Sequence, residues 1–505
     1  MRLLALAAIL CLLLVFAIRA ADSLAHAGRA VTFPYGLDYG EGTVWQQALM
    51  IPGPNMYGDI THPPFIVFEY PPVYHLLVRA LVSVGIDPLA AGRSISLAAT
   101  IVIAVLIGNI TFAATRENSS TKARILGSIL AGLIIFPYRP VEESAVWMHV
   151  DVLAIGFSFA GIYMSIVAGY RIFTLCIAVL LFSFAVYTKQ TELSAPIATF
   201  LIIATVDRRS ALQAVIFGSI ISGAALTVLL LITNGGFWRH IIEYNRHNRF
   251  VFDNIPYLLS RQRRDAAGLV TGFAAFAFLW WREATSRKLP DLAGWFAAIR
   301  ESEQLRALSI ISLWFVLASA QLVTLGRPGA WDNYFVEWMC ITAVPIGMAA
   351  VVWTRLATKA SSALFPGLAG LLCSLALATQ GLHRWPYELG IVDNPRAAAV
   401  RRQLVDLIRA SRKPVISDDM VLILRAGKHV FIEPAIFTEL ADTGYWDQGP
   451  LLKLIQNHAF ALVITQTVRM QDEVAGGVFT DEVAHAIESS YPFIERLDNY
   501  VIRRP

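Results

Sequence analysis

The chain has 505 residues, of which 56% are hydrophobic and only 15% are charged. A soluble domain of this length would be less apolar, and a net charge of +4 without basic tracts argues against a nucleic-acid partner. Hydrophobic runs recur up to about residue 382, so the sequence predicts a polytopic α-helical membrane protein. The four cysteines fall inside these runs, where they suggest neither a disulfide nor a metal site: Cys11, Cys176, Cys340 and Cys373.

The first apolar run is Leu3–Ala20, after Arg2. It suits either a cleaved signal peptide or an uncleaved first span whose N-terminus is inside. Residues 22–90 then form a first outer loop, in which Asp38 and Glu41 lie three residues apart among glycines and tyrosines. Two interpretations follow: the acids cap a helix over Thr43–Met50, or one of them is a carboxylate held at the membrane surface to accept a proton.

The same loop continues with a tyrosine- and proline-rich stretch that includes Tyr70 and Tyr74. The apolar run that follows, 75–84, is too short to cross a membrane and predicts an interfacial helix. Further spans are expected at 91–113, 123–136, 148–168, 172–187, 193–206, 212–233, 267–281, 307–325, 334–353 and 364–381, which gives about eleven transmembrane helices.

The basic residues between spans fall mostly on one side, which is therefore expected to be cytoplasmic. This places the first loop and residues 383–505 outside. The outer loop 234–266 breaks the pattern because it carries six arginines, including Arg246 and Arg249. Their planar side chains suit a lipid phosphate of the substrate, and they equally suit surrounding headgroups.

From residue 383 the composition changes to alternating short strands and helices. Strands are expected at 414–417, 429–432 and 461–464, and helices at 396–410, 451–455 and 481–489. The pattern predicts two parts: a membrane domain at 1–382 and a small extracytoplasmic α/β domain at 383–505. The second part would cover the first or dock an acceptor.

Several polar residues are predicted at the outer ends of spans. His149 and Asp151 begin the fourth span, and an acid there is costly unless it faces a wet cavity. Lys189 follows the fifth span, where it either snorkels to headgroups or meets a phosphate. The start of the tenth span adds four more: Arg327, Asn333, Tyr334 and Glu337. Asp332 or Asn333 also suits a simple helix cap.

These motifs together resemble the GT-C glycosyltransferase superfamily, in its protein O-mannosyltransferase and lipid A aminoarabinose transferase branch. The similarity rests on the Asp38–Glu41 loop, the Tyr-Pro-Pro stretch, His149-Val150-Asp151, Thr188-Lys189 and Asn333-Tyr334-Phe335-Val336-Glu337. It covers residues 1 to about 380 by order of elements. Many relatives carry adjacent acids where Gly40 precedes Glu41 here, so the resemblance leaves open which acid is the base.

The resemblance implies an inverting transferase that moves a sugar from a polyprenyl phosphate to an acceptor hydroxyl on the outer face of a cell inner membrane. Asp38 or Glu41 would be the base, with Asp151 as positioner or second base. Lys189, Arg327, Arg246 and Arg249 would hold the phosphate, and Tyr70, Tyr74, His149, Asn333, Tyr334 and Glu337 would line the cavity. The chemistry requires no cofactor, although Asp38 and Glu41 also suit a divalent cation.

Two other classes fit the composition. A transporter or lipid-linked sugar flippase would explain the spans and the polar residues, but the sequence has no repeated halves and no paired broken spans. A non-catalytic membrane scaffold leaves Asp38, Glu41, Asp151 and Lys189 unexplained.

Overall fold

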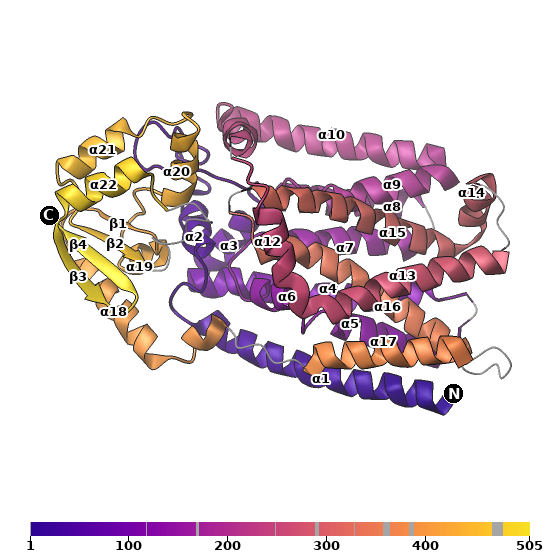
Figure 1. The fold of residues 1–505 in the computed structure, drawn as a ribbon. Helices are drawn as coiled ribbons and strands as arrows, with labels where there is room; N and C mark the ends of the chain where they lie inside the picture. The colour runs from indigo at the N-terminus through magenta and orange to yellow at the C-terminus, as the bar shows by residue number, and fades with distance from the viewer. Residues whose placement is uncertain are drawn as a thin grey trace.

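The computed structural model describes residues 2–117, 119–167, 171–247, 249–287, 292–327, 329–356, 364–382, 388–466 and 478–505. Most of it is a bundle of long helices, with a smaller sheet-containing part at one end (Figure 1). Each predicted span coincides with one helix: α1 (Arg2–Thr32), α4 (Pro88–Ala114), α5 (Thr121–Leu133), α7 (Asp151–Val167), α8 (Ile172–Thr188), α9 (Ser194–Val206), α10 (Arg208–Ile232), α13 (Ala266–Arg287), α15 (Glu303–Gln321), α16 (Val336–Leu356) and α17 (Leu364–Leu382).

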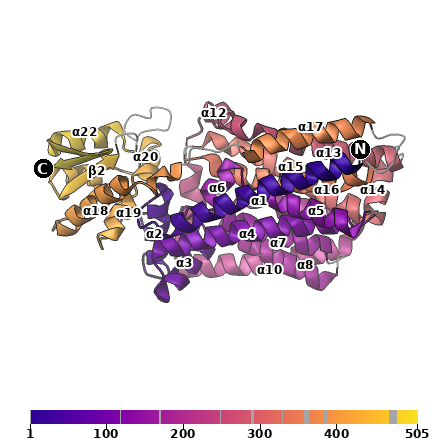
Figure 2. The same cartoon turned by 90° about the horizontal axis from the view of Figure 1, so that it is seen from below.

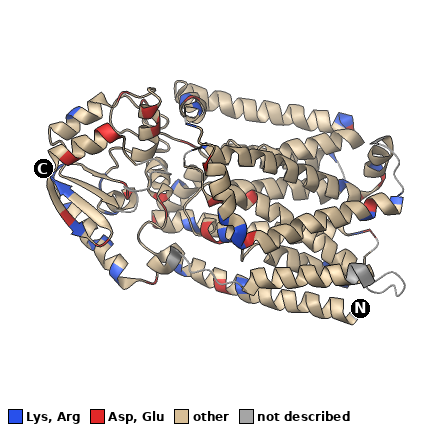
Figure 3. Cartoon of the chain, viewed as in Figure 1, with Lys and Arg blue, Asp and Glu red and all other residues tan. Residues whose placement is uncertain are grey.

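Among the described residues, five helical segments are both long and apolar enough to cross a membrane, as expected of a multi-pass membrane protein: Leu3–Thr32, Pro88–Ala114, Arg208–Ile232, Glu303–Gly326 and Asp332–Leu356. Helices satisfy their own backbone hydrogen bonds, as lipid requires. Among the five, the segment that contains α16 is the most enclosed and α10 lies on the outside of the bundle. The long helices carry few charges over most of their length (Figure 3).

The bundle is held together by close helix contacts through small residues. A Cβ on Gly347 of α16 would lie 2.5 Å from the Cβ of Ala131 on α5, so only glycine allows this approach. Helix α1 belongs to the same core through Leu12, Phe16 and Ala20, and it lies beside α17 along one face of the bundle (Figure 2).

The first loop contains two helices, α2 (Gly40–Met50) and α3 (Val73–Ser83), which match the predicted helix and the predicted interfacial helix. Both lie at the end of the bundle nearest the sheet (Figure 1). The other short elements of the membrane part are α6 (Arg139–Ser144), α11 (Gly236–Trp238), the π-helical turn η1 (Arg239–Tyr244), α12 (Asn254–Arg261), η2 (Gln262–Asp265), α14 (Leu292–Glu301), η3 (Leu322–Gly326) and η4 (Asp332–Phe335).

The C-terminal part is a four-stranded sheet with helices around it, in the strand order β1-β2-β4-β3. Strands β1 (Val415–Ser417) and β2 (Leu462–Gln466) pair in parallel, whereas β4 (Tyr500–Arg504) pairs antiparallel with β2 and with β3 (Phe493–Leu497). The helical elements are η5 (Glu388–Ile391), α18 (Pro395–Ala410), α19 (Met420–Arg425), α20 (Pro434–Asp442), α21 (Gly449–Gln456) and α22 (Asp481–Ser490).

The prediction of a strand at 429–432 is wrong. Residues 429–432 form no strand, and Ile432 instead makes a single parallel bridge to Phe65 of the first loop. The Phe65 N–H donates to the Phe431 carbonyl at 2.8 Å, and the Glu433 N–H donates to the Phe65 carbonyl at 3.0 Å. The apolar run is therefore used to attach the C-terminal part to the first loop.

Candidate active site

The ends of α7 and α8 bring an acid and a base together. Helix α7 begins at Asp151 and α8 ends at Thr188, followed by Lys189, and the two helices pack against each other. A carboxylate at a helix start and an ammonium at a helix end both complement the helix dipole. The Lys189 Nζ donates to Asp151 Oδ1 at 2.7 Å, and the Asp151 side chain is only 1% exposed.

The turn before α16 completes the surroundings of this ion pair. Asn333 Nδ2 donates to the same Asp151 oxygen at 3.0 Å. The Lys189 ammonium also lies 4.9 Å from the centre of the Tyr334 ring, within the range of a cation–π contact. Asp151, Lys189, Asn333 and Tyr334 are therefore brought together, as their expected level in the membrane suggested.

His149 connects this group to the first loop. Its Nε2 donates to Asp38 Oδ2 at 2.8 Å, and its Nδ1 lies 3.9 Å from Asp151 Oδ2. Burial disfavours the charged imidazole, but the Asp38 carboxylate outweighs it and raises the pKa of His149 to about 9. Gly40 makes room for this contact, because a Cβ there would lie 2.6 Å from His149 Nε2. The imidazole is therefore positively charged at neutral pH.

Glu41 is fully buried and pairs with Arg93 of α4. Its two oxygens accept from Arg93 Nε at 2.8 Å and Nη2 at 2.7 Å, and also from the backbone N–H groups of Leu37 and Met148. The same guanidinium donates to three backbone carbonyls, one in the last turn of α1 and two just after that helix. Both Glu41 oxygens are therefore bound by Arg93.

The two tyrosines of the Tyr-Pro-Pro stretch have different surroundings. Tyr74 is buried and donates to the Gly92 carbonyl at 2.8 Å, which places it against α4. Burial, followed by the neighbouring acids Glu69 and Asp151, raises the pKa of the Tyr70 phenol well above its usual value. Tyr70 therefore remains a hydrogen-bond donor beside the Asp38–His149 pair.

Glu69 is an acid that the sequence did not single out. Burial, then repulsion from Glu433 and Glu439 of the C-terminal part, raises the pKa of Glu69 to about 8. Tyr39 donates a short hydrogen bond to Glu433, which itself caps the start of α20. The only available signal was the position of Glu69 directly before Tyr70.

Glu337 lies deeper in the bundle. Its carboxylate accepts from Ser194 Oγ at 2.5 Å and from Trp314 Nε1 at 2.6 Å. Glu192 accepts a hydrogen bond from Ser158 at 3.2 Å and interacts electrostatically with both Glu337 and Lys189. Glu337 is thus connected to the Asp151–Lys189 pair through its neighbours rather than by direct contact.

The expected phosphate-binding arginines separate into two groups. Arg327 and Arg246 are exposed, and Arg327 lies close enough to Tyr334 to interact with it electrostatically. Arg249 instead forms an ion pair of 3.5 Å with Asp442 of the C-terminal part. Arg261 of the same loop binds Asp332, which therefore serves as an ion-pair partner rather than a side-chain cap for η4.

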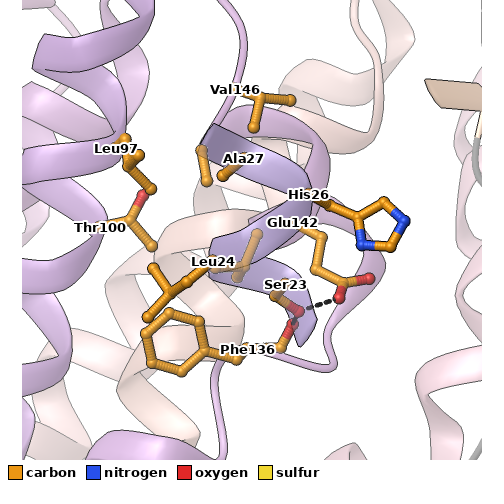
Figure 4. A pocket seen from close by; sticks show the side chains of 11 residues that line it. Ser23, Leu24, His26, Ala27, Leu97, Thr100, Phe136, Glu142 and Val146 are labelled. Carbon is orange, nitrogen blue, oxygen red and sulfur yellow. Dashed lines mark hydrogen bonds between the residues drawn. The ribbon is translucent and has the colours of Figure 1, made fainter. Parts of the chain in front are cut away.

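A small cavity of about 20 Å³, lined by residues of α1, α4 and α6, lies near this region (Figure 4). It has room for about one water molecule. Ser23 and Glu142 form a hydrogen bond at its edge, and none of the candidate site residues lines it. Within the described ranges, no three His, Cys, Asp or Glu side chains are grouped so as to hold a metal ion.

The fold of this chain is similar to those of two solved proteins, ArnT and an oligosaccharyltransferase, which confirms the resemblance seen in the sequence at the level of the fold. The similar solved structures include ArnT from Cupriavidus metallidurans bound to undecaprenyl phosphate, with a TM-score of 0.56, 12% identity, and 96% of this chain and 97% of that chain covered. They also include the Archaeoglobus fulgidus oligosaccharyltransferase in the apo form, with a TM-score of 0.51, 10% identity, and 90% and 70% covered.

A second structure of that oligosaccharyltransferase, in complex with Zn and sulfate, has a TM-score of 0.51 at 11% identity and covers 93% of this chain and 71% of that chain. No protein-family model matches the sequence, and no curated protein matches it significantly.

Proposed function

We propose that this protein is an inverting glycosyltransferase that moves a sugar from a polyprenyl phosphate to an acceptor hydroxyl. The observation that carries the proposal is the group Asp38, His149, Asp151 and Lys189, which joins the first loop to the starts and ends of bundle helices. The fold, shared with ArnT bound to undecaprenyl phosphate, supports a lipid-phosphate donor.

Asp38 is the best candidate for the general base. Its side chain pairs with His149 but is still 25% exposed, whereas those of Asp151 and Glu41 are 1% and 0% exposed and bind Lys189 and Arg93. Asp38 would take the proton of the acceptor hydroxyl while the acceptor oxygen forms a bond to the anomeric carbon. The bond from that carbon to the phosphate oxygen breaks at the same time, and the anomeric configuration inverts.

The leaving group is a lipid phosphate, which needs its charge stabilised rather than a proton. Lys189 is held in place by Asp151, which also accepts a hydrogen bond from Asn333, and the charged His149 and exposed Arg327 add positive charge nearby. Asp151 is in this view a positioning residue for Lys189 and His149. No step of the proposed reaction uses a metal ion, and Glu41 is paired with Arg93.

The site would face outward, with the chain in a cell inner membrane and the C-terminal part on the same outer face. Attachment of that part to the first loop through Phe65 supports its role as a cover that keeps water from the donor.

The test is sugar transfer by the purified full chain in nanodiscs, with a panel of radiolabelled polyprenyl-phosphate sugars. Consumption of one donor, lost in Asp38→Asn and kept in a stability-matched variant outside the site, would establish the enzyme and its base. If no donor is consumed, while labelled lipid or solute crosses the membrane of proteoliposomes that hold the same protein, the protein is a transporter and the proposal is wrong.

A further inference from the structure

The backbone of Val67–Tyr70, in the first loop, is held by side chains rather than by secondary structure. These residues belong to no helix or strand. Four side chains from distant parts of the chain form hydrogen bonds with their backbone: Gln47, Tyr57, Gln190 and His240. Buried N–H and C=O groups need such partners, because leaving them unpaired is costly. The position of this segment is therefore set by these four side chains.

The segment ends at the candidate active site. Gln190, the residue after Lys189, donates to the Glu69 carbonyl at 2.9 Å, which connects the segment to the turn that carries the lysine. The Tyr70 phenol interacts electrostatically with Asp38 and Asp151. A shift of the Val67–Tyr70 backbone would therefore move Tyr70 relative to both acids.

His240 is bound in one protonation state by its two hydrogen bonds. Its Nδ1 lies 2.9 Å from the Phe68 backbone nitrogen, and its Nε2 lies 2.7 Å from the Gly58 carbonyl oxygen. A backbone N–H only donates and a carbonyl only accepts, so Nδ1 carries no proton and Nε2 carries one. Burial lowers the pKa of His240 to about 4, which agrees with a neutral ring. A charged imidazole could not accept from Phe68.

The His240 ring is also fixed by its surroundings. It lies on the π-helical turn η1 and is fully buried, with the rings of Tyr57, Phe68 and Tyr244 at centroid distances of 5.7, 5.8 and 4.9 Å. Gly236 allows the start of this turn to approach the first loop, because a Cβ there would lie 2.0 Å from the Tyr57 carbonyl oxygen. π-Helical turns are rare and frequently occur at functional sites. The loop after α10 thus holds the first loop through a rigid aromatic contact.

We propose that His240 is a positioning residue for the sugar transfer: through the Phe68 N–H it fixes the Val67–Tyr70 backbone and hence the place of Tyr70 beside Asp38. This role rests on the proposed function, in which Asp38 is the base. Without His240 the Phe68 N–H would be buried and unpaired, so the segment would rearrange to satisfy it. A misplacement of about 1 Å in an active site can cost about 10²-fold in rate.

The test is donor consumption by the full chain in nanodiscs, with the radiolabelled polyprenyl-phosphate sugar that the wild type consumes. We expect His240→Leu to lower kcat per folded molecule by about 10–100-fold, with little change in KM for the donor. His240→Asn should recover most of the rate, because its amide oxygen lies near the position of Nδ1 and can accept from Phe68.

The matched control is Ser302→Ala. It removes the side-chain acceptor of another buried backbone N–H, that of Leu305 at 3.1 Å. Ser302 directly precedes α15 and follows α14, which lies at the end of the bundle away from the sheet (Figure 1). This variant should lower the unfolding temperature and leave kcat per folded molecule unchanged.

A double variant shows whether His240 acts through Tyr70. In a Tyr70→Phe background, His240→Leu should lower kcat by less than about threefold, because the hydroxyl that it positions is already absent. Equal losses in His240→Leu and His240→Asn, or an undiminished loss in the Tyr70→Phe background, would overturn the proposal. If the wild type consumes no donor, the proposed function fails; if it consumes donor and His240→Leu does so equally fast, only this inference fails.

Nitrogen-15 NMR of the histidine-labelled full chain tests the hydrogen bonds without any activity. The His240 signals, assigned by their absence in His240→Asn, should show a protonated Nε2 and an unprotonated Nδ1 from pH 6 to pH 8. The opposite tautomer, or a charged ring in that range, would overturn the proposal whether or not sugar transfer is detected.

Discussion

Substituting Glu41 and Asp38 separately distinguishes a structural carboxylate from a catalytic one. Glu41→Gln leaves the Arg93 guanidinium buried, with its side chain 0% exposed and its bidentate partner uncharged. Removal of one member of a buried ion pair costs about 3–5 kcal/mol, and the three carbonyls that also accept from Arg93 favour the lower end. Asp38→Asn affects a partly exposed pair with His149 and should cost about 1 kcal/mol.

The assay combines thermal unfolding in nanodiscs with donor consumption at a temperature where both variants are folded. We expect Glu41→Gln to unfold earlier but to retain most of its activity per folded molecule. Asp38→Asn should unfold near the wild type and lose about 10²–10⁴-fold in rate. The opposite result, a stable Glu41→Gln protein without activity beside an active Asp38→Asn protein, would refute the assignment of Asp38 as base and Glu41 as structural partner.

Three other predictions concern the same region. Lys189→Met should abolish transfer and destabilise the fold, because it leaves Asp151 buried without its cation. The double variant Asp151→Asn/Lys189→Met should regain stability but not activity. Equal unfolding temperatures for the single and the double variant would contradict the buried pair. Because the pKa of His149 is raised to about 9, the charged imidazole stabilises the fold fully below its ordinary pKa of about 6.5, and this stabilisation is lost as pH rises through 9. The unfolding temperature of His149→Gln should therefore depend less on pH over that range than the unfolding temperature of the wild type. The pKa of Glu69 is raised to about 8, so the stabilising contribution of its protonated form to folding is lost as pH rises from about 4.5 to 8. Glu69→Gln should therefore match the stability of the wild type near pH 4.5 and exceed it at pH 8.5. A variant that is less stable than the wild type at pH 8.5 would show that the charged form is favoured.

The membrane helices could be predicted because lipid leaves few alternatives. Every expected span became a helix, since an apolar segment in a bilayer must satisfy its own backbone. That Asp151 and Lys189 lie close together follows from the same logic, although their ion pair was not predicted. A short connection between two spans forces them to be antiparallel, so the start of one lies beside the end of the next.

The different roles of Asp38 and Glu41 could not be predicted from their local sequence. Both acids lie near a helix start among glycines, and the choice depends on Arg93, which is 52 residues away from Glu41. An arginine in an otherwise apolar helix was the available signal, because such a residue needs a partner. The expected strand at 429–432 was wrong for a similar reason: a short apolar run does not reveal that its partner, Phe65, belongs to the first loop.

The hydrogen bond between Tyr39 and Glu433 joins positions 394 residues apart. At about 5–20 residues per second, a ribosome needs tens of seconds to make the chain between them. During that time the first loop has been made but lacks its partners from the C-terminal part. The order of synthesis therefore delays completion of the site until the bundle helices are already in the membrane, and it leaves the early loop open to proteases and to chaperones in the interval.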